Sequence, residues 1–450
     1  KDMITSKNAR LRLVLGALLV LATAATCTLR LPAGSEPTAS PANDYAQGSG
    51  GVNAPSQRDK PYLVLVSIDG FRWDYMDRHP TPNLHRIARN GARAERLLPV
   101  FPTLTFPNHY SIATGLYPAH HGLTGNEFPD HSRNKWYSLR NREMVEDGGF
   151  YGGQPIWVTA ETQGMVSASF FWVGTEAAVN GVSPTHWRSF NKDISGAERV
   201  DQVLRWMEQP PANRPHPYTL YFEDVDDHSH WYGPGSEENI KAISRVDAWL
   251  GRLLDGIDKL PYSQQVNIIV VSDHGQGPYL SGQEPFMLGD LIDLSGMTII
   301  EGGSYLFMHF DHNDPERAAA IAAAVNETWR HGHAYTSATA PAAWVVDGNP
   351  RFPDVMLIPE QGYAVLSSAE KAGKINAGDH GCAPESPAMH GLFIASGPNI
   401  KPGVELGPVR NIDIYPLMLS ILGLDAPEYI DGDPSGLSAK LYSDGDKHSR

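Results

Sequence analysis

The sequence predicts an α/β protein with a mostly parallel central sheet that is sandwiched by helices. Two runs of apolar and β-branched residues, YLVLVSI at 62–68 and NIIVV at 267–271, are typical of strands that are buried on both faces. Each run ends close to a carboxylate, Asp69 or Asp273, and amphipathic helical patterns lie between such strands. Strands that alternate with helices favour one α/β sandwich with a small accessory lobe.

Composition limits the function. The chain has 450 residues, of which 41% are apolar, so it can bury a large core. Its formal net charge is -15 and it has no cluster of basic residues, which argues against a nucleic-acid polymer as partner. A small anion held by metal ions remains compatible with this charge. The only two cysteines, Cys27 and Cys382, exclude a disulfide framework and a cysteine-based zinc finger.

The amino-terminal segment has the pattern of an export signal. Basic residues precede the apolar run LVLGALLVLATAA, which is too short for a comfortable membrane span. We therefore expect a signal peptide at 1–30 and an exported protein, periplasmic or secreted, without a transmembrane segment in the mature chain. A retained anchor and lipid attachment at Cys27 are the less favoured alternatives. A flexible linker at 31–59 and a catalytic domain at 60–440 follow, with the accessory lobe at about 285–375.

The next elements carry the first candidate site residues. The pattern TPNLHRIARNG at 81–91 predicts a helix, and FPTLTFPNHYSIATGLYPAHHG at 101–122 predicts a loop that enters another helix. Because proline is favoured at the first helical position, Pro107 predicts that Thr105 and Phe106 lie just before the helix. The free N–H groups there suit a phosphate. In the alternative interpretation, Thr105 only caps the helix.

The second half of the chain supplies most of the expected metal ligands. The stretch TLYFEDVDDHSHWYGP at 219–234 predicts a strand that ends in an acidic loop, where Asp226 and His230 lie four residues apart. The stretch at 236–260 predicts an amphipathic helix that packs on the sheet. Two late histidines compete as a further ligand, and we favour His380 in a glycine-flanked loop over His390, which directly precedes an apolar strand.

The strand ends together form a set of hard oxygen and nitrogen ligands. Asp69, Asp226 with His230, Asp273 with His274, and a late histidine suit Zn²⁺ better than Mg²⁺. Two such ions about 4 Å apart stabilise the attacking and leaving oxygens of a phosphoryl transfer. Coordination to a metal would also activate the Thr105 hydroxyl as a nucleophile.

These motifs resemble those of the nucleotide pyrophosphatase/phosphodiesterase family of the alkaline phosphatase superfamily. SIDGFR, the 101–122 stretch with TGNEF, GGQPIWVTAETQG, FFWVG, YFEDVDDHSHWYGP, SDHG and GDHG occur in the family's order over about residues 60 to 430. The resemblance implies an alkaline phosphatase-like fold and two Zn²⁺ ions per chain. One ion would be held by Asp69, Thr105, Asp273 and His274, and the other by Asp226, His230 and His380.

The resemblance also implies a reaction and a substrate. Thr105 would be transiently esterified by phosphate, and Asn126 would hydrogen-bond a non-bridging oxygen together with a backbone N–H near Thr105. An insertion after FFW is typical of members that act on nucleotides, and it is present here. By position, Phe106 and Trp187 would stack on the base. Departures from the family pattern at Ser229, Pro129 and Cys382 with Ala383 affect loop geometry, since none of these residues is an expected ligand.

The functional hypothesis is hydrolysis of nucleotide pyrophosphate and phosphodiester bonds of a small nucleotide substrate, with release of a nucleoside 5′-monophosphate. A phosphomonoesterase or a lysophospholipid-type phosphodiesterase on the same scaffold is one alternative. A non-catalytic surface module that is stabilised by metal is the other.

Overall fold

The central feature is an eight-stranded sheet whose two middle strands are fully buried. The structure is a computed structural model that describes residues 51–443, all within one compact unit. In spatial order the strands are β19 (Val404–Leu406), β2 (Gly91–Ala94), β18 (Phe393–Ser396), β9 (Val266–Val271), β1 (Tyr62–Ile68), β8 (Pro217–Phe222), β6 (Ala168–Phe170) and β7 (His186–Trp187). Strands β9, β1, β8, β6 and β7 are mutually parallel, and only β18 pairs antiparallel with its neighbours. The predicted mostly parallel α/β fold is confirmed.

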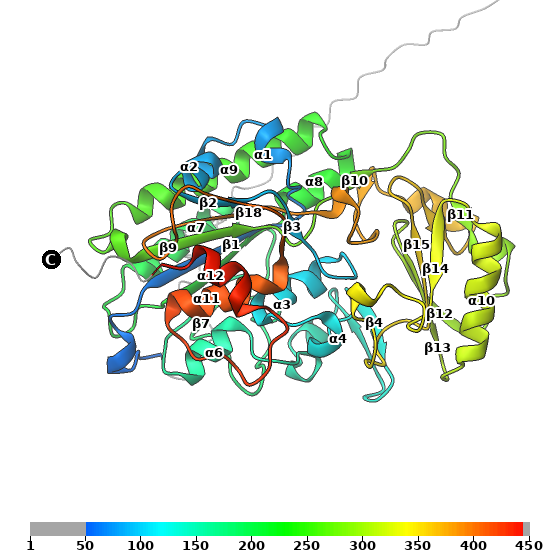
Figure 1. Ribbon diagram of the computed structural model, residues 1–450, viewed down its shortest axis with the longest axis horizontal. Coiled ribbons are helices and arrows are strands. Elements are labelled where there is room, and N and C mark those ends of the chain that lie inside the picture. The colour runs from blue at the N-terminus through cyan, green and yellow to red at the C-terminus, as the bar shows by residue number, and fades with distance from the viewer. Residues whose placement is uncertain (1–50, 444–450) are drawn as a thin grey trace, which may run out of the picture. The chain divides into compact units, whose positions relative to one another are not determined.

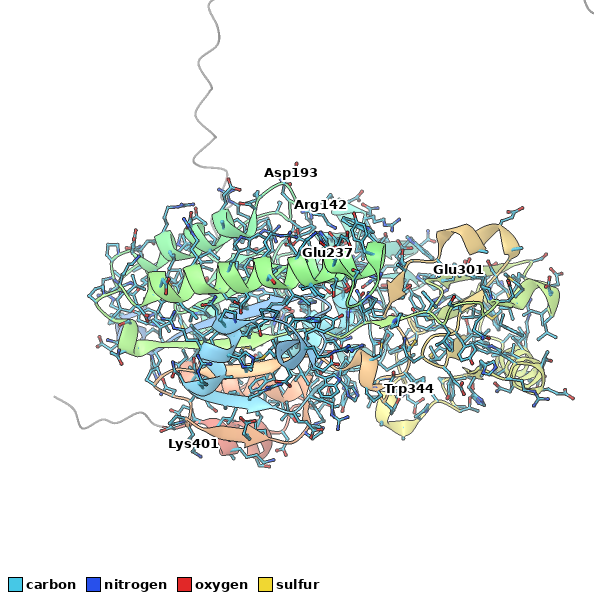
Figure 2. All side chains as sticks on the ribbon, turned by 90° about the horizontal axis from the view of Figure 1, so that it is seen from above. Arg142, Asp193, Glu237, Glu301, Trp344 and Lys401 are labelled. Atoms are coloured by element: carbon cyan, nitrogen blue, oxygen red, sulfur yellow. The ribbon has the colours of Figure 1, made fainter. Side chains whose placement is uncertain are left out.

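Helices cover both faces of the sheet (Figure 1). Side chains alternate along β1, so that Leu63 and Leu65 enter one core while Val64 and Val66 enter the other. The first core is closed by α3 (Thr105–Thr114), α6 (Ile156–Thr162), α11 (Ile414–Leu422) and α12 (Ala439–Leu441). The second is closed by α2 (Pro82–Arg89), α7 (Gly196–Met207) and α9 (Glu237–Ile257). Figure 2 shows α9, which begins at the labelled Glu237, running along its face of the sheet.

A second, smaller sheet lies in the segment 297–359. Its antiparallel strands are β12 (Met297–Glu301), β13 (Leu306–Phe310), β15 (Val355–Pro359) and β14 (Gly332–Tyr335), in that spatial order. Helix α10 (Pro315–Thr328) packs on one face. The other face packs against the loop before α3, where Phe101 stacks on Trp344 with ring centroids 4.0 Å apart. We call this sheet with α10 the small lobe; its hydrophobic contacts fix the loop that leads to Thr105.

Short elements complete the described chain. Four two-stranded pairs are β3 (Leu97–Leu98) with β20 (Val409–Arg410), β4 (Glu127–Asp130) with β5 (Lys135–Ser138), β10 (Gly277–Pro278) with β17 (Gly378–Asp379), and β11 (Phe286–Met287) with β16 (Val365–Leu366). The remaining α-helices are α1 (Tyr75–Arg78), α4 (Pro118–His121), α5 (Arg142–Val145) and α8 (Asp224–Tyr232), and short 3₁₀ and π turns connect several elements.

The expected signal peptide, Cys27 and most of the linker lie outside the described residues. Within residues 51–443, no helix combines the length and the apolar character that a membrane crossing requires.

Candidate active site

The ligand-type side chains meet at one edge of the central sheet. Strand β1 lies between β9 and β8, and all three run in the same direction, so their carboxyl ends share an edge. Asp69 directly follows β1, Asp273 and His274 follow β9, and Asp226 lies in the helix that follows β8. This edge is where open α/β sheets bind their ligands.

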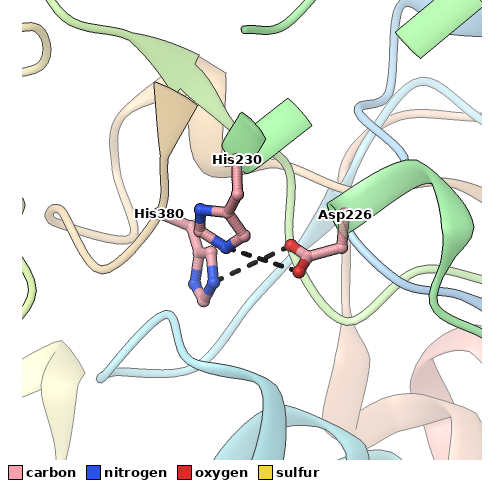
Figure 3. Close-up of side chains that lie close together, drawn as sticks. All are labelled: Asp226, His230 and His380. Carbon is pink, nitrogen blue, oxygen red and sulfur yellow. Dashed lines mark ion pairs between the residues drawn. The ribbon is translucent and has the colours of Figure 1, made fainter. Parts of the chain in front are cut away.

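Asp226, His230 and His380 form one group (Figure 3). Asp226 and His230 lie on helix α8, not in an acidic loop as the charge pattern suggested, and the spacing of four puts both on one helix face. The His230 Nε2 atom lies 3.3 Å from Asp226 Oδ2, and His380 Nε2 lies 3.8 Å from Asp226 Oδ1. Three ligand-type atoms therefore point at a common centre.

The other expected ligands converge beside this group. His274 Nε2 lies 2.9 Å from Asp273 Oδ2, 3.6 Å from Asp69 Oδ1 and 3.3 Å from the Thr105 hydroxyl oxygen. The rings of His274 and His380 stack with centroids 3.6 Å apart, so the two groups adjoin. The structure thus brings together all seven residues that the sequence predicted as metal ligands.

The three histidines are oriented alike. Each places its Nδ1 atom beside a backbone carbonyl oxygen: His230 at 2.9 Å from Gly378, His380 at 2.8 Å from Thr103, and His274 at 3.1 Å from Gly275. Because a carbonyl oxygen only accepts, Nδ1 carries the proton and donates it there. The Nε2 atoms point into the cluster, which is the usual arrangement of histidine metal ligands.

The carboxylates of the cluster favour a cation. Asp69 Oδ1 and Asp273 Oδ2 are buried and accept no hydrogen bond. Burial raises the pKa of Asp69 well above its ordinary value, and the negative charges of Asp273 and Asp226 add to the rise. Burial favours neutral His230, but the Asp226 carboxylate outweighs this and raises the pKa of His230 to about 10. Metal ions would compensate these buried charges, so the residues present fit a metal centre.

Gly70 lets two of the strand ends approach each other. Its backbone has a φ of +67°, which favours glycine. A Cβ atom at this position would lie about 3.0 Å from the Cα and Cβ atoms of Asp226. A side chain at residue 70 would therefore push Asp226 away from Asp69. Glycine is required here both by the positive φ and by the close approach of Asp226.

Helix α3 begins earlier than the sequence predicted. Thr105 is its first residue, so Pro107 is the third residue and not the first, and Thr105 and Phe106 lie inside the first turn. The first four N–H groups of a helix have no partner within the helix, so proline is tolerated throughout the first turn. The half-buried Thr105 still presents its hydroxyl to His274.

Asn126 contacts the first turn of α3 at Phe106, the residue after Thr105. The Asn126 side-chain oxygen accepts a hydrogen bond from the Phe106 N–H at 2.9 Å. Its amide nitrogen is thereby directed away from Phe106. The Phe106 N–H is bound to Asn126, so the expected second donor near Thr105 is not the Phe106 N–H.

His390, the rejected alternative to His380, lies outside the metal groups. Its Nε2 atom lies 2.9 Å from the Pro384 carbonyl oxygen.

An aromatic pocket adjoins Thr105. We use this name for the pocket that is lined by Thr105, Phe106, Leu139, Arg142, Val145, Phe171, Trp172, Val173, Gly174, Glu176, Phe190 and Tyr221. Phe106, which the resemblance implied as a base-stacking residue, is among these lining residues. Trp187 is not: it lies in β7, at the end of the central sheet, and Phe190 from the same segment lines the pocket instead. The two-residue strand β7 pairs with β6, which holds residue 187 in the sheet.

Two further residues of the site were missed from the sequence. His109 is buried and lies one turn after Thr105; its Nδ1 is 2.9 Å from the Thr105 carbonyl oxygen and 3.3 Å from Asp273 Oδ2. Its Nε2 lies 2.8 Å from Ser67 Oγ, so both ring nitrogens have protein partners and the ring lies against the Asp273 carboxylate. Tyr221 donates a hydrogen bond to Asp69 Oδ2 at 2.6 Å. The helical spacing of four between 105 and 109 was the available signal.

The chain is similar in sequence to several proteins that are named as pyrophosphatases or phosphodiesterases. The human ectonucleotide pyrophosphatase/phosphodiesterase family member 1 is 34% identical over 378 residues, which cover 82% of this chain and 41% of the relative. An uncharacterized pyrophosphatase/phosphodiesterase of Schizosaccharomyces pombe is also 34% identical, with 81% of this chain and 77% of that protein covered. A venom phosphodiesterase of Crotalus durissus collilineatus is 32% identical, with 88% and 48% covered. This chain spans less than half the length of the human and venom relatives.

Solved structures agree with the sequence matches. Murine ectonucleotide pyrophosphatase/phosphodiesterase 5 superimposes with a TM-score of 0.78 at 28% identity, covering 84% of this chain and all of that chain. An inactive variant of the same murine protein, in complex with AMP, superimposes equally well. The family model for type I phosphodiesterase / nucleotide pyrophosphatase matches residues 63–383. The chain belongs to the type I phosphodiesterase / nucleotide pyrophosphatase family.

Proposed function

We propose that this chain hydrolyses nucleotide pyrophosphate and phosphodiester bonds and releases a nucleoside 5′-monophosphate, with Thr105 as the nucleophile. The observation that carries the proposal is the hydroxyl of Thr105 beside a buried cluster of three aspartates and three histidines. The names of its relatives and the AMP bound to the murine structure support a nucleotide substrate.

We further propose two Zn²⁺ ions as the cofactor. Asp226, His230 and His380 would hold one ion, and Asp69, Asp273, His274 and the Thr105 hydroxyl the other. The mixed oxygen and nitrogen donor set suits zinc. Bound divalent ions lower the pKa of a coordinated hydroxyl and neutralise charge on the phosphoryl oxygens.

The chain's own residues position the reaction. Thr105 Oγ1, its hydroxyl proton released to solvent, attacks phosphorus while the bond from phosphorus to the leaving oxygen breaks, and the leaving group departs as an anion or takes up a proton from solvent. Water then attacks phosphorus, the bond to Oγ1 breaks, and the threonine oxygen takes a proton back from the water. Asn126 keeps its amide nitrogen available for a non-bridging oxygen, because its oxygen accepts from the Phe106 N–H. A fixed donor of this kind stabilises charge as it develops in the transition state.

The aromatic pocket is the proposed nucleoside site. Phe106 and Phe190 both line it beside Thr105, and their rings would stack on the base. Arg142, labelled in Figure 2, pairs with Glu176, and both residues also line the pocket. This ion pair offers the base edge a donor and an acceptor. Phe190 thus replaces Trp187 as the proposed stacking partner.

We also propose that the protein is exported, as the amino-terminal pattern predicts. Several relatives are named as ectoenzymes or venom enzymes, which agrees with this location.

The test of the nucleophile is Thr105→Ala, assayed on the p-nitrophenyl ester of thymidine 5′-monophosphate. We expect loss of turnover with zinc content near two per chain by mass spectrometry, and partial recovery in Thr105→Ser. The exposed Thr162→Ala on α6 is the control and should keep full activity. Turnover by Thr105→Ala at the parent rate would refute the nucleophile, and faster hydrolysis of p-nitrophenyl phosphate than of the diester would favour a phosphomonoesterase.

A further inference from the structure

A second pocket adjoins the metal-ligand cluster. It has a volume of about 340 Å³, and His230, His380 and Asn126 line it together with Glu301 and Tyr305 of the small lobe. This volume lies within the range of small-molecule sites. We call it the polar pocket, because charged and amide side chains make up much of its wall.

The polar pocket and the aromatic pocket meet at Thr105. Leu104 lines the polar pocket and the next residue, Thr105, lines the aromatic one. The same division recurs after strand β5, where Leu139 lines the aromatic pocket and Arg140 lines the polar pocket. A substrate whose phosphorus lies at the Thr105 hydroxyl, with its nucleoside in the aromatic pocket, therefore extends its leaving group into the polar pocket.

The β4–β5 hairpin fixes the backbone at Arg140. The Leu139 N–H donates to the Asn126 carbonyl oxygen at 3.0 Å, and the Arg140 N–H donates to Ser138 Oγ at 3.2 Å. The Ser138 hydroxyl in turn donates to Glu127. Arg140 is thus held beside Asn126, which the proposed function places at the reacting phosphate.

Arg140 is the cation of this pocket that is free to bind an anion. Its side chain is exposed, and within residues 51–443 it forms no ion pair and no side-chain hydrogen bond. The other basic residue described in the pocket, Lys371, lies 3.4 Å from Glu301, whose position on β12 is marked in Figure 2.

We propose that Arg140 binds a phosphate group of the leaving group and so gives the enzyme a preference for phosphoanhydride substrates. The inference rests on the proposed function. A guanidinium fork matches two phosphate oxygens at once, whereas it offers nothing comparable to an uncharged alcohol. The formal net charge of -15 disfavours a highly charged leaving group, and a local cation at Arg140 would offset part of that repulsion.

The experiment compares two substrates that differ in the leaving group. ATP releases pyrophosphate, and the p-nitrophenyl ester of thymidine 5′-monophosphate releases a phenol. For Arg140→Ala we expect kcat/KM for ATP to fall about 10- to 100-fold, while the value for the ester stays within about twofold. Arg140→Lys keeps the charge without the fork and should lie between the parent and the alanine variant. Arg89→Ala, an exposed residue of α2, is the control and should change neither rate.

The outcomes separate the inference from the proposed function. The parent protein serves as reference only if it hydrolyses the ester. If Arg140→Ala then lowers kcat/KM for ATP and for the ester by the same factor, or lowers neither value, Arg140 does not bind the leaving group. Hydrolysis of the ester by a parent that does not hydrolyse ATP would also overturn the inference. A parent that hydrolyses neither substrate would refute the proposed function itself.

Discussion

Tyr221→Phe removes one hydrogen bond from the metal-ligand cluster and leaves the ring in place. The Tyr221 hydroxyl donates to Asp69 Oδ2 at 2.6 Å, and Asp69 is 1% exposed. The other oxygen of this carboxylate has no hydrogen-bond partner. Phenylalanine would therefore leave Asp69 with neither carboxylate oxygen hydrogen-bonded to a side chain.

The expected loss follows from that geometry. A hydrogen bond to a charged group contributes about 1.5–3 kcal/mol, which is about a tenfold to hundredfold change in an equilibrium constant. Losses of this size, about 10- to 100-fold, are typical when a partner of a metal ligand is mutated. We expect zinc affinity, measured by competition with a chelating dye, to fall by this factor. Since the ring still lines the aromatic pocket, KM for a nucleotide diester should change little.

The same strand supplies a matched control. The hydroxyl of Tyr218 on β8 is buried and has no hydrogen-bond partner, so Tyr218→Phe removes the same atom without breaking a bond. Tyr218→Phe should keep the parent's zinc affinity. Equal zinc affinities of the Tyr221→Phe and Tyr218→Phe proteins would refute the positioning role of Tyr221.

Three further predictions concern the base, the metals and the core. Phe190→Ala should raise KM for a nucleotide diester about fivefold or more in steady-state kinetics, because stacking contributes about 1–3 kcal/mol per base. Trp187→Ala should leave this KM unchanged. The opposite ranking of the two variants would restore Trp187 as the stacking partner. Excess chelator should abolish diester hydrolysis and lower the melting temperature, because the buried carboxylates lose their counter-charge. Added Zn²⁺ should restore both the activity and the melting temperature. Full activity in the presence of chelator would exclude a metal centre. Arg199→Ala leaves buried Glu223 unpaired and should lower the free energy of unfolding in urea by about 3–5 kcal/mol, while Arg252→Ala, from an exposed pair, should show no measurable change.

The metal-ligand cluster could be predicted because regular structure determines where its members lie. Asp69 and Asp273 follow buried parallel strands, and the carboxyl ends of such strands share an edge. The spacing of Asp226 and His230 indicated one site, although a helix and not a loop brings them together. Local pattern was sufficient wherever the side-chain direction follows from a strand end or a helix turn.

The pocket walls could not be predicted in the same way. Most of segment 171–195 is irregular, so nothing in its pattern states that Phe190 and not Trp187 turns toward Thr105. His109 lies within a helix whose buried face is continuous, and a buried histidine there looks like a core residue. The polar pocket depends on the small lobe meeting the loop before α3, which is a tertiary contact that no local spacing reveals.

The β4–β5 hairpin gives one short segment influence over both halves of a bound molecule. Neighbouring residues at its end, Leu139 and Arg140, contribute to different pockets. Exchanging this loop between homologous proteins would alter preference for the retained portion and for the departing portion together, while the strands that carry the aspartates stay untouched. Changes confined to this one surface hairpin would therefore alter selectivity within the family, without renewed optimisation of the reactive centre.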